Sequence, residues 1–333
     1  MLILSFESSC DETSCAVVDM SDESRVIRSN IIASQISIHA LYGGVVPEIA
    51  SRAHCEAISS ITDQALDKAN ITLDEIDAVA VTYTPGLVGA LLVGVNFAKA
   101  LAYSVGKPLV GVDHIKGHVA ASYFLTPAPK PPFLAFVASG GHTSLIDVKS
   151  YTDFDTIGRT RDDAMGEAFD KVARVIGLGY PGGAEMDKLA SVGDPKAIKF
   201  PSPAIPDDSL DFSFSGLKTA VINHVNTLKM KELSYNKADI AASFTYAITN
   251  SVINKLSSAV ERTRRIKLVA AGGVSANSHL RASLKAFSIR NNISLYLPDL
   301  SLCGDNAAMI GAQAYYEYKA GKIADLRLNA VVN

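Results

Sequence analysis

Two short apolar runs at the start of the chain flank a loop of small and acidic residues. Residues 2–6 (LILSF) and 15–20 (CAVVDM) have β character, whereas the stretch ESSCDETS between them is polar. This pattern predicts a β-hairpin. The loop carries two adjacent carboxylates, Asp11 and Glu12. An ordinary turn would explain them, but carboxylates beside buried strands are costly unless they have a role.

The same pattern returns after a proline-rich segment, residues 126–132 (TPAPKPP), which we interpret as a linker. Residues 133–148 (FLAFVASGGHTSLIDV) again combine apolar run, small polar loop and apolar run. The loop glycines would let a ligand approach backbone N–H groups closely. A third unit, residues 267–277 (KLVAAGGVSAN), predicts a strand and a glycine turn before a helix, an arrangement that suits an anionic or nucleotide ligand. The repeat predicts two lobes of similar build.

The rest of the sequence predicts further strands and helices around these units. Apolar spacing predicts helices from Pro47 and over residues 237–263, and residues 199–209 predict a surface loop. The long apolar stretch 86–106 contains glycines, an Asn and Lys99, so we expect a buried or partner-facing helix and not a membrane span. Together the loops, lobes and repeated hairpin are typical of an α/β, actin-like ATPase fold, in which two ribonuclease-H-like lobes surround a nucleotide cleft.

Composition narrows the class of protein. The 333 residues, 48% of them hydrophobic, are enough for two domains with real cores. A protein that held nucleic acid alone would usually be basic, whereas the net charge here is −3. The four cysteines form no CxxC pair, which favours a reducing compartment. The N-terminal segment lacks the basic region of a signal peptide, so we expect a cytoplasmic protein.

The strongest candidate for chemistry is HIKGH, residues 114–118, after the apolar run KPLVGV. His114 and His118 would lie on one face at the start of a helix, close enough to share a metal ion. Unrelated surface or core histidines are the alternative. A zinc-protease site would lack its general base, because Ile115 replaces the glutamate of HExxH. Asp305, in CGDN, is either the N-cap of a helix beginning there or a third, oxygen ligand.

Motifs spread over nearly the whole chain resemble those of one family, the tRNA N6-adenosine threonylcarbamoyltransferases (TsaD in bacteria). The matching pieces are SSCDET (8–13), YGGVVPEIASRAH (42–54), PGL (85–87), HIKGH (114–118), SGGHT (139–143), GEAFDK (166–171), YPGG (180–183), FSFSGLKTA (212–220), GGVSAN (272–277) and CGDNAAMIG (303–311). Small departures, such as Ser275 and Gly304 where Ala and Thr are commoner, remove neither a ligand nor a loop glycine.

This resemblance implies an activity. An N6-L-threonylcarbamoyladenine synthase transfers the threonylcarbamoyl group of threonylcarbamoyl-AMP to N6 of the adenosine 3′ to the anticodon, in tRNAs that read codons starting with A, and releases AMP. The resemblance makes His114, His118 and Asp305 ligands of one divalent metal, iron foremost or zinc, and Asp11 or Glu12 the base, with Asp11 favoured. It assigns donor binding to Val137, Ala138, Ser139, Gly140, Gly141, Asp170, Gly183, Asp187 and Asn277.

The resemblance also implies lobes and partners. The first lobe would span residues 1–126 and 306–333, and the second residues 127–305. A TsaB-like paralogue would dimerise with the first lobe, with Gly89 and Gly94 permitting close helix packing, and a TsaE-like ATPase would assist. Arg159, Arg161 and residues 261–267 are candidates for tRNA contact, or a solvated charged face. A metabolite phosphotransferase of the same fold and a non-catalytic scaffold are the rival functions.

Overall fold

The computed structural model describes residues 1–201, 205 and 209–332, and the chain divides into two compact units. The first contains Met1–Pro129, Ser150–Asp153 and Pro298–Asn333, and the second contains Lys130–Lys149 and Phe154–Leu297. This division differs from the predicted lobes at its edges. Residues 298–305 lie in the first unit and not in the second, so Asp305 shares a unit with the histidine pair.

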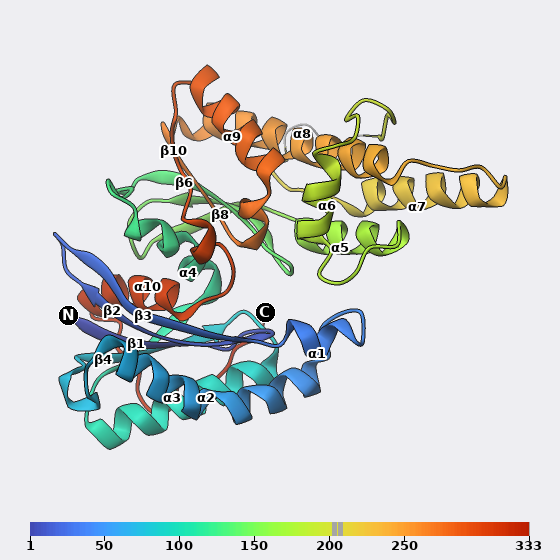
Figure 1. The fold of residues 1–333 in the computed structure, drawn as a ribbon. Helices are drawn as coiled ribbons and strands as arrows, with labels where there is room; N and C mark the ends of the chain where they lie inside the picture. The colour runs from blue at the N-terminus through green and yellow to red at the C-terminus, as the bar shows by residue number, and fades with distance from the viewer. Residues whose placement is uncertain (202–204, 206–208, 333) are drawn as a thin grey trace. The chain divides into compact units, whose positions relative to one another are not determined.

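The first unit is built on a five-stranded sheet in the order β3-β2-β1-β4-β5 (Figure 1). The strands are β1 (Leu2–Glu7), β2 (Glu12–Met20), β3 (Arg25–Ser34), β4 (Ala78–Thr84) and β5 (Leu109–Asp113). β2 runs antiparallel to β1 and β3, whereas β4 is parallel to β1 and β5. The predicted N-terminal hairpin is confirmed.

Helices cover both faces of this sheet, and successive side chains of β1 point alternately to one face and to the other. Leu4 and Phe6 belong to the apolar cluster that packs α2 (Pro47–Ala69) and α3 (Val88–Val105) on one face. Ser5 points to the other face, where its hydroxyl donates to the Ala307 carbonyl of α10 (Ala307–Lys319) over 2.7 Å. α4 (His114–Ala120) packs against α10 on that face (Figure 1). Shorter elements are α1 (Ile36–Ala40), η1 (Leu73–Glu75), η2 (Ala121–Phe124) and η4 (Leu300–Leu302).

α3 is, within the residues the structure describes, the one helix that is long and apolar enough to cross a membrane by length and composition. It packs on β4 and α2 with one face buried, while much of the rest of the helix is partly or fully exposed. The contact of this helix with a partner stays a prediction, but Gly89 and Gly94 also have neighbours within the chain. A Cβ on the buried Gly94 would overlap Ser8, and one on the half-buried Gly89 would overlap the hydroxyl of Ser51.

The second unit repeats the sheet of the first. Its order is β10-β9-β6-β7-β8, with the same combination of antiparallel and parallel neighbours. The strands are β6 (Phe133–Ala138), β7 (Thr143–Val148), β8 (Phe154–Arg159), β9 (Lys267–Ala271) and β10 (Ser294–Tyr296). The repeat that the two hairpin patterns predicted is therefore present in the strand order as well.

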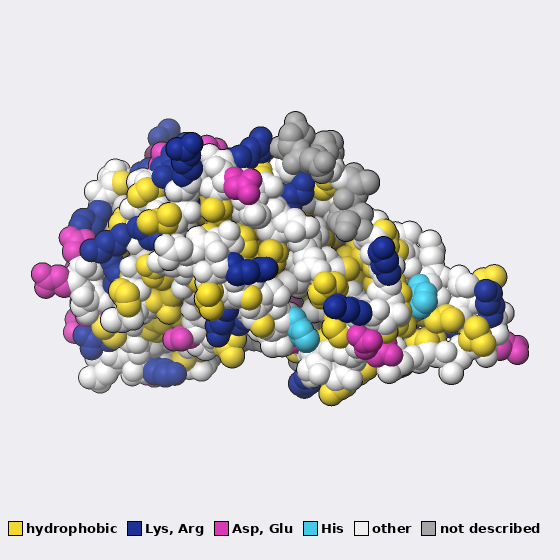
Figure 2. Space-filling view, turned by 90° about the horizontal axis from the view of Figure 1, so that it is seen from above, with side chains coloured by type: hydrophobic (Ala, Val, Ile, Leu, Met, Phe, Trp, Pro, Cys, Tyr) yellow, Lys and Arg dark blue, Asp and Glu magenta, His cyan; other side chains and the backbone are white. Residues whose placement is uncertain are grey.

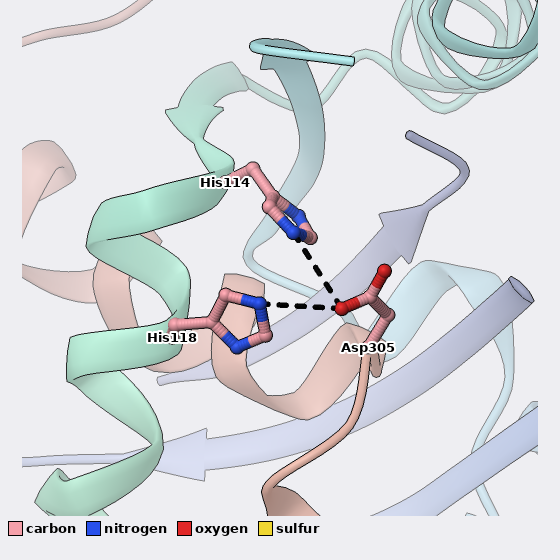
Figure 3. A group of neighbouring side chains, drawn as sticks. All are labelled: His114, His118 and Asp305. Atoms are coloured by element: carbon pink, nitrogen blue, oxygen red, sulfur yellow. Dashed lines mark ion pairs between the residues drawn. The ribbon is translucent and has the colours of Figure 1, made fainter. Parts of the chain in front are cut away.

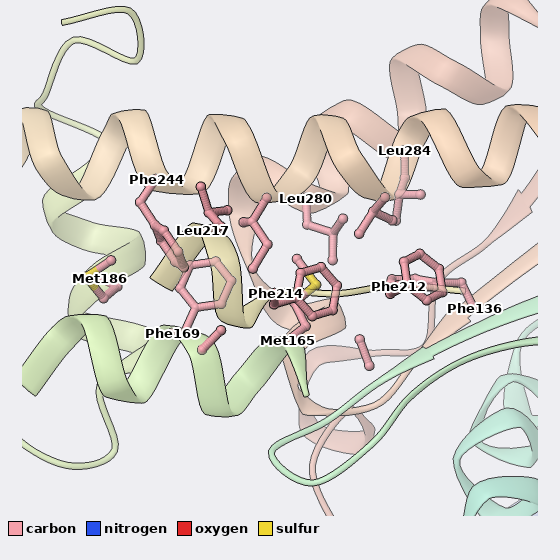
Figure 4. Close-up of a cluster of buried hydrophobic side chains, with 14 of the residues drawn as sticks. Phe136, Met165, Phe169, Met186, Phe212, Phe214, Leu217, Phe244, Leu280 and Leu284 are labelled. Atoms are coloured by element: carbon pink, nitrogen blue, oxygen red, sulfur yellow. The ribbon is translucent and has the colours of Figure 1, made fainter. Parts of the chain in front are cut away.

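In the described part of the second unit, five helices share one apolar core with the sheet. They are α5 (Met165–Val175), α6 (Gly183–Ala190), α7 (Ser215–Met230), α8 (Lys237–Thr263) and α9 (Ser278–Arg290), the last preceded by η3 (Gly273–Ala276). Figure 4 shows Phe169 of α5 against Phe244 of α8, with ring centroids 5.2 Å apart. Much of the surface loop predicted over residues 199–209 falls on positions 202–204 and 206–208, outside the described residues.

Candidate metal centre and its surroundings

The histidine pair lies where β5 ends and α4 begins. The Asp113 carboxylate caps this helix by accepting from the N–H groups of Ile115 and Lys116. The next helical turn places His118 on the same face as His114, as predicted. Asp305 approaches from the loop before α10, and its Oδ1 lies 3.5 Å from Nε2 of His114 and 3.2 Å from Nε2 of His118 (Figure 3). The structure thus brings Asp305 to a histidine pair that lies far from it in the sequence.

This group fits a metal ion. One ligand atom from each residue lies within 4.8 Å of the others. Ligands about 2.1 Å from one tetrahedral ion are about 3.4 Å apart, close to the two distances from Oδ1. Within the described part of the chain, neither nitrogen of the buried His118 ring makes a hydrogen bond. A buried imidazole without hydrogen bonds is costly, and a metal at Nε2, beside Asp305, would relieve much of that cost.

Asp305 is not the helix cap that the sequence allowed. α10 begins at Ala307, and its N-cap is Asn306, whose side-chain oxygen accepts from the N–H of Met309 over 3.1 Å. The Asn306 amide also donates to the Gly304 carbonyl, which fixes the loop on both sides of Asp305. The neighbouring asparagine therefore performs the capping and leaves the aspartate side chain to the histidines.

Glu7 is the residue of this site that the sequence analysis missed. It is buried at the end of β1, on the same face as Ser5, and its Oε2 lies 2.9 Å from Nδ1 of His114. Burial alone would raise the pKa of Glu7, but the charge and hydrogen bond of His114 outweigh it, and the pKa is lowered. Burial opposes the charged form of His114, yet the charges of Glu7 and Asp305 raise its pKa to about 9.

The loop of the N-terminal hairpin is held by a buried network. His54 of α2 donates from Nε2 to the Cys10 carbonyl over 3.0 Å, so its Nδ1 accepts from the Thr13 hydroxyl over 2.7 Å. The backbone N–H of Gln35 donates to the Asp11 carbonyl over 3.0 Å. Burial lowers the pKa of His54, which favours this neutral form. Hydrogen bonds therefore hold the backbone carbonyls of both Cys10 and Asp11, and Asp11 is the first of the two predicted catalytic carboxylates.

Glu12, in the same hairpin, has an unusual acidity. Burial, followed by the charge of Asp11, raises the pKa of Glu12 to about 8. Its Oε1 accepts from the Ser34 hydroxyl over 2.7 Å. A carboxyl group with a pKa near neutrality is a stronger base than an ordinary carboxylate once it has lost its proton, as general catalysis at neutral pH requires.

In the second unit, the residues predicted for donor binding begin with the turn between β6 and β7. The N–H of Ser139 donates to the His142 carbonyl over 2.8 Å, so that group closes the turn. Gly140 and Gly141 are exposed, and a Cβ on either would meet nothing within 4 Å. A Cβ on Gly272, whose φ is +89°, would overlap the Ala138 carbonyl. The glycine turn after β9 therefore packs directly on the end of β6, which contains Val137.

The other predicted donor residues join α5, α6 and α9. Asp170 of α5 accepts from the N–H of Gly182 over 2.7 Å, just before Gly183 begins α6. Asp187 of α6 accepts from the N–H and hydroxyl of Ser278, the first residue of α9. Asn277 caps the same helix by accepting from the N–H of Leu280 over 2.9 Å. The structure thus links these helix starts through the side chains that the sequence singled out.

The basic residues considered for tRNA contact are partly committed to ion pairs. Arg161 binds Asp211 over 2.7 Å, and Arg265 binds both carboxylate oxygens of Asp147. On the face drawn in Figure 2, Lys and Arg side chains are scattered among hydrophobic and acidic ones and form no continuous patch. This distribution agrees with the near balance of charge in the sequence.

Comparison with known proteins connects this geometry to a family. The family model described as "TsaD: tRNA N6-adenosine threonylcarbamoyltransferase" matches residues 26–312. Curated relatives with the name tRNA N6-adenosine threonylcarbamoyltransferase include one from Clostridium botulinum (strain 657 / Type Ba4), 53% identical over 331 residues, which are 99% of this chain and 96% of the relative. One from Clostridium novyi (strain NT) is 52% identical over 332 residues, with the same coverage.

Solved structures show the fold. Full-length HypF in the phosphate- and nucleotide-bound form superposes with a TM-score of 0.61 at 14% identity, over 96% of this chain and 46% of HypF, so this chain spans less than half of that protein. The activator of 2-hydroxyisocaproyl-CoA dehydratase from Clostridium difficile, with bound ADPNP, gives a TM-score of 0.54 at 14% identity over 97% of both chains. The predicted α/β, actin-like fold is confirmed.

Proposed function

The chain belongs to the family of tRNA N6-adenosine threonylcarbamoyltransferases, and from this premise we propose that its donor is threonylcarbamoyl-AMP. In this reaction N6 of the adenosine 3′ to the anticodon attacks the carbamoyl carbon, in tRNAs reading codons that start with A. A C–N bond forms, the C–O bond to phosphate breaks, AMP leaves with the electron pair, and N6 loses a proton. The observation that supports this most directly is the paired histidines with Asp305, within a chain so similar to named transferases.

In the first unit, His114 and His118 supply imidazole ligands and Asp305 a carboxylate ligand. Two imidazoles and one carboxylate suit iron(II), which we propose as the native ion, and also zinc. When bound, the ion supplies a Lewis acid that polarises the donor's carbamoyl or neighbouring oxygens. The roles of the chain's own residues are to hold the ligand set in a buried environment and to keep the third ligand, Asp305, between the two rings.

In the second unit, residues Val137–Gly141, at the end of β6 and in the turn after it, would border the donor's phosphate and carbamoyl region, with the backbone N–H groups of Gly140 and Gly141 facing it. The exposure of Gly140 and Gly141, with open space at both Cα atoms, supports this role. Asp170 would accept from ribose hydroxyls, while Gly183, Asp187 and Asn277 line the adenosine end. Their hydrogen bonds to the starts of α6 and α9 support rigid placement of these groups.

The proton lost from N6 requires an acceptor, since an exocyclic amine is a poor nucleophile. We assign this task to the hairpin carboxylates. The resemblance favours Asp11, whereas the pKa of Glu12, raised to about 8, suits Glu12 for general base catalysis near neutral pH. Asp11 contributes in either case, because its charge is one of the causes of that raised pKa.

The charge of the chain indicates that it needs helpers to hold tRNA, and the family resemblance implies which proteins these are. With a net charge of −3 and no basic patch on the face drawn in Figure 2, we propose that tRNA is held together with helper proteins in the cytoplasm. These are a TsaB-like paralogue that forms a heterodimer through the first unit and a TsaE-like ATPase. The exposed part of α3, which includes Val88 at 51% and Tyr103 at 75% exposure, is our candidate for the paralogue's contact.

The test is direct transfer. Purified protein is incubated with tRNA and threonylcarbamoyl-AMP carrying a labelled threonine, with and without the two helper proteins. The proposal predicts label on N6 of the adenosine 3′ to the anticodon and an equal amount of AMP. Release of AMP without labelled tRNA, in the presence of both helpers, would contradict the assignment of the acceptor. Phosphorylation of a metabolite by metal-free protein would favour the phosphotransferase instead.

A further inference from the structure

The two histidines of the metal centre are held in different ways. Both rings are buried, but only His114 has a carboxylate behind it: Glu7 Oε2 lies 2.9 Å from Nδ1. His118 has no hydrogen-bond partner on either nitrogen among the described residues. A ring nitrogen beside an anionic acceptor carries the proton, and this fixes which nitrogen has the lone pair. Glu7 therefore determines which nitrogen of His114 can bind a metal, whereas no hydrogen bond determines this for His118 among the described residues.

Glu7 is itself held from three sides. The N–H of Ser9 donates to its Oε1 over 2.6 Å, and the Thr82 hydroxyl donates to its Oε2 over 2.6 Å. The third donor is His114 Nδ1–H at the same Oε2. The side chain of Glu7 is fully buried. Such a carboxylate, with its neighbours all acting as donors, has one orientation, and it presents an acceptor to His114 in any state of the metal site.

We propose that Glu7 is the positioning residue of this metal centre. It keeps the proton of His114 on Nδ1 and so aims the lone pair of Nε2 at the site shared with Asp305. This deepens the proposed function, on which it rests, by making His114 a preset ligand and His118 an adaptable one. Partners behind metal-binding histidines typically change metal affinity by about 10–100-fold when they are removed.

Glu7→Gln tests this because an amide cannot satisfy all three donors. If the Gln oxygen faces Ser9, its NH2 group faces Nδ1 of His114 and favours the tautomer with the proton on Nε2. If the oxygen faces His114, the NH2 group opposes the N–H of Ser9. Thr82→Val is the matched control, since it removes one donor to Glu7 at the same depth but leaves the carboxylate and His114 together.

Two measurements decide the matter. The first is the tautomer of His114 in metal-free protein, read from long-range 1H–15N spectra with assignments from His114→Ala. The spectra are recorded above the pKa of about 9 that Glu7 and Asp305 give His114, where the ring carries a single proton. We expect the proton on Nδ1 in wild type and Thr82→Val, and a shift toward Nε2 in Glu7→Gln. The second is Zn2+ affinity by competition with a chromophoric chelator. We expect a loss of about 10–100-fold for Glu7→Gln and less than about threefold for Thr82→Val.

Each failure has its own meaning. A wild-type His114 with its proton on Nε2 overturns the proposal, even if Glu7→Gln does not fold. So does a folded Glu7→Gln protein that binds Zn2+ as the wild type does. Equal losses in Glu7→Gln and Thr82→Val would make Glu7 a structural residue and also overturn the proposal. A wild type that binds no Zn2+ at all would instead refute the metal centre of the proposed function, and this inference with it.

Discussion

Gly311→Val tests whether the docking of α10 on the sheet places Asp305. A Cβ at Gly311 would lie 2.6 Å from Cγ2 of Val18 and 2.9 Å from Oγ of Ser5. Because a carbon–carbon contact relaxes at about 3.6 Å, the helix would have to withdraw by about 1 Å. Overpacking costs about 1–3 kcal/mol, and valine recovers part of that because glycine is a poor helix former. We expect a net loss of about 2 kcal/mol in the free energy of unfolding.

The same withdrawal would move Asp305, which lies two residues before α10. Metal–ligand distances tolerate only about 0.2 Å, so we expect Zn2+ affinity to fall about tenfold or more. Urea unfolding and chelator competition measure the two effects. Gly304→Ala is the control, because a Cβ there meets nothing within 4 Å although it adjoins Asp305. A Gly311→Val protein that loses stability but binds Zn2+ as the wild type does would refute this reasoning.

Three further predictions follow from the burial and pKa shifts. The carboxyl 13C signal of Glu12 in metal-free protein should titrate near pH 8, whereas an ordinary glutamate has a pKa of 4.5. Glu12→Gln should gain stability over wild type as pH rises between those values, because the folded wild type holds the proton more tightly than the unfolded chain. An equal advantage at pH 4 and pH 9 would contradict this. His54→Ala removes the hydrogen bond to the Cys10 carbonyl, so the free energy of unfolding should fall by about 1–3 kcal/mol. Threonylcarbamoyl transfer should also fall, while Zn2+ still binds. Full transfer activity in this variant would exclude a role for this network. Phe244→Ala should cost about 3–5 kcal/mol in the second unit, where Phe244 is fully buried, yet leave Zn2+ affinity unchanged; a loss of Zn2+ binding would show that the units are not independent in this respect.

Local patterns predicted the parts of the structure that local chemistry determines. Runs of apolar side chains and the glycines between them predicted the hairpin loops, the helix from Pro47 and the strand that precedes His114. The repeat of these patterns also predicted two similar sheets, which the structure has in the same strand order. Periodicity is informative here because each strand and helix buries one regular face.

What the sequence could not provide depends on contacts between distant segments. Asp305 was open between cap and ligand until the structure showed that Asn306 caps α10. Glu7 looked like the first residue of a polar loop, although a single charged residue directly after the run LILSF was a signal that deserved weight. Its role depends on His114, 107 positions away in sequence. The hydrogen-bond network of His54 could not be predicted from the sequence either, because its partners come from the hairpin and from Gln35.

The most direct test of the central claim is the metal content of the purified chain beside that of His118→Ala. His118 is the better choice of ligand to remove, because within the described residues its ring has no hydrogen bonds whose loss would confuse the result. The account predicts about one iron or zinc per wild-type chain, and little or none in the variant, with the fold intact. Equal metal in both proteins, or none in the wild type after reconstitution with either ion, would contradict it.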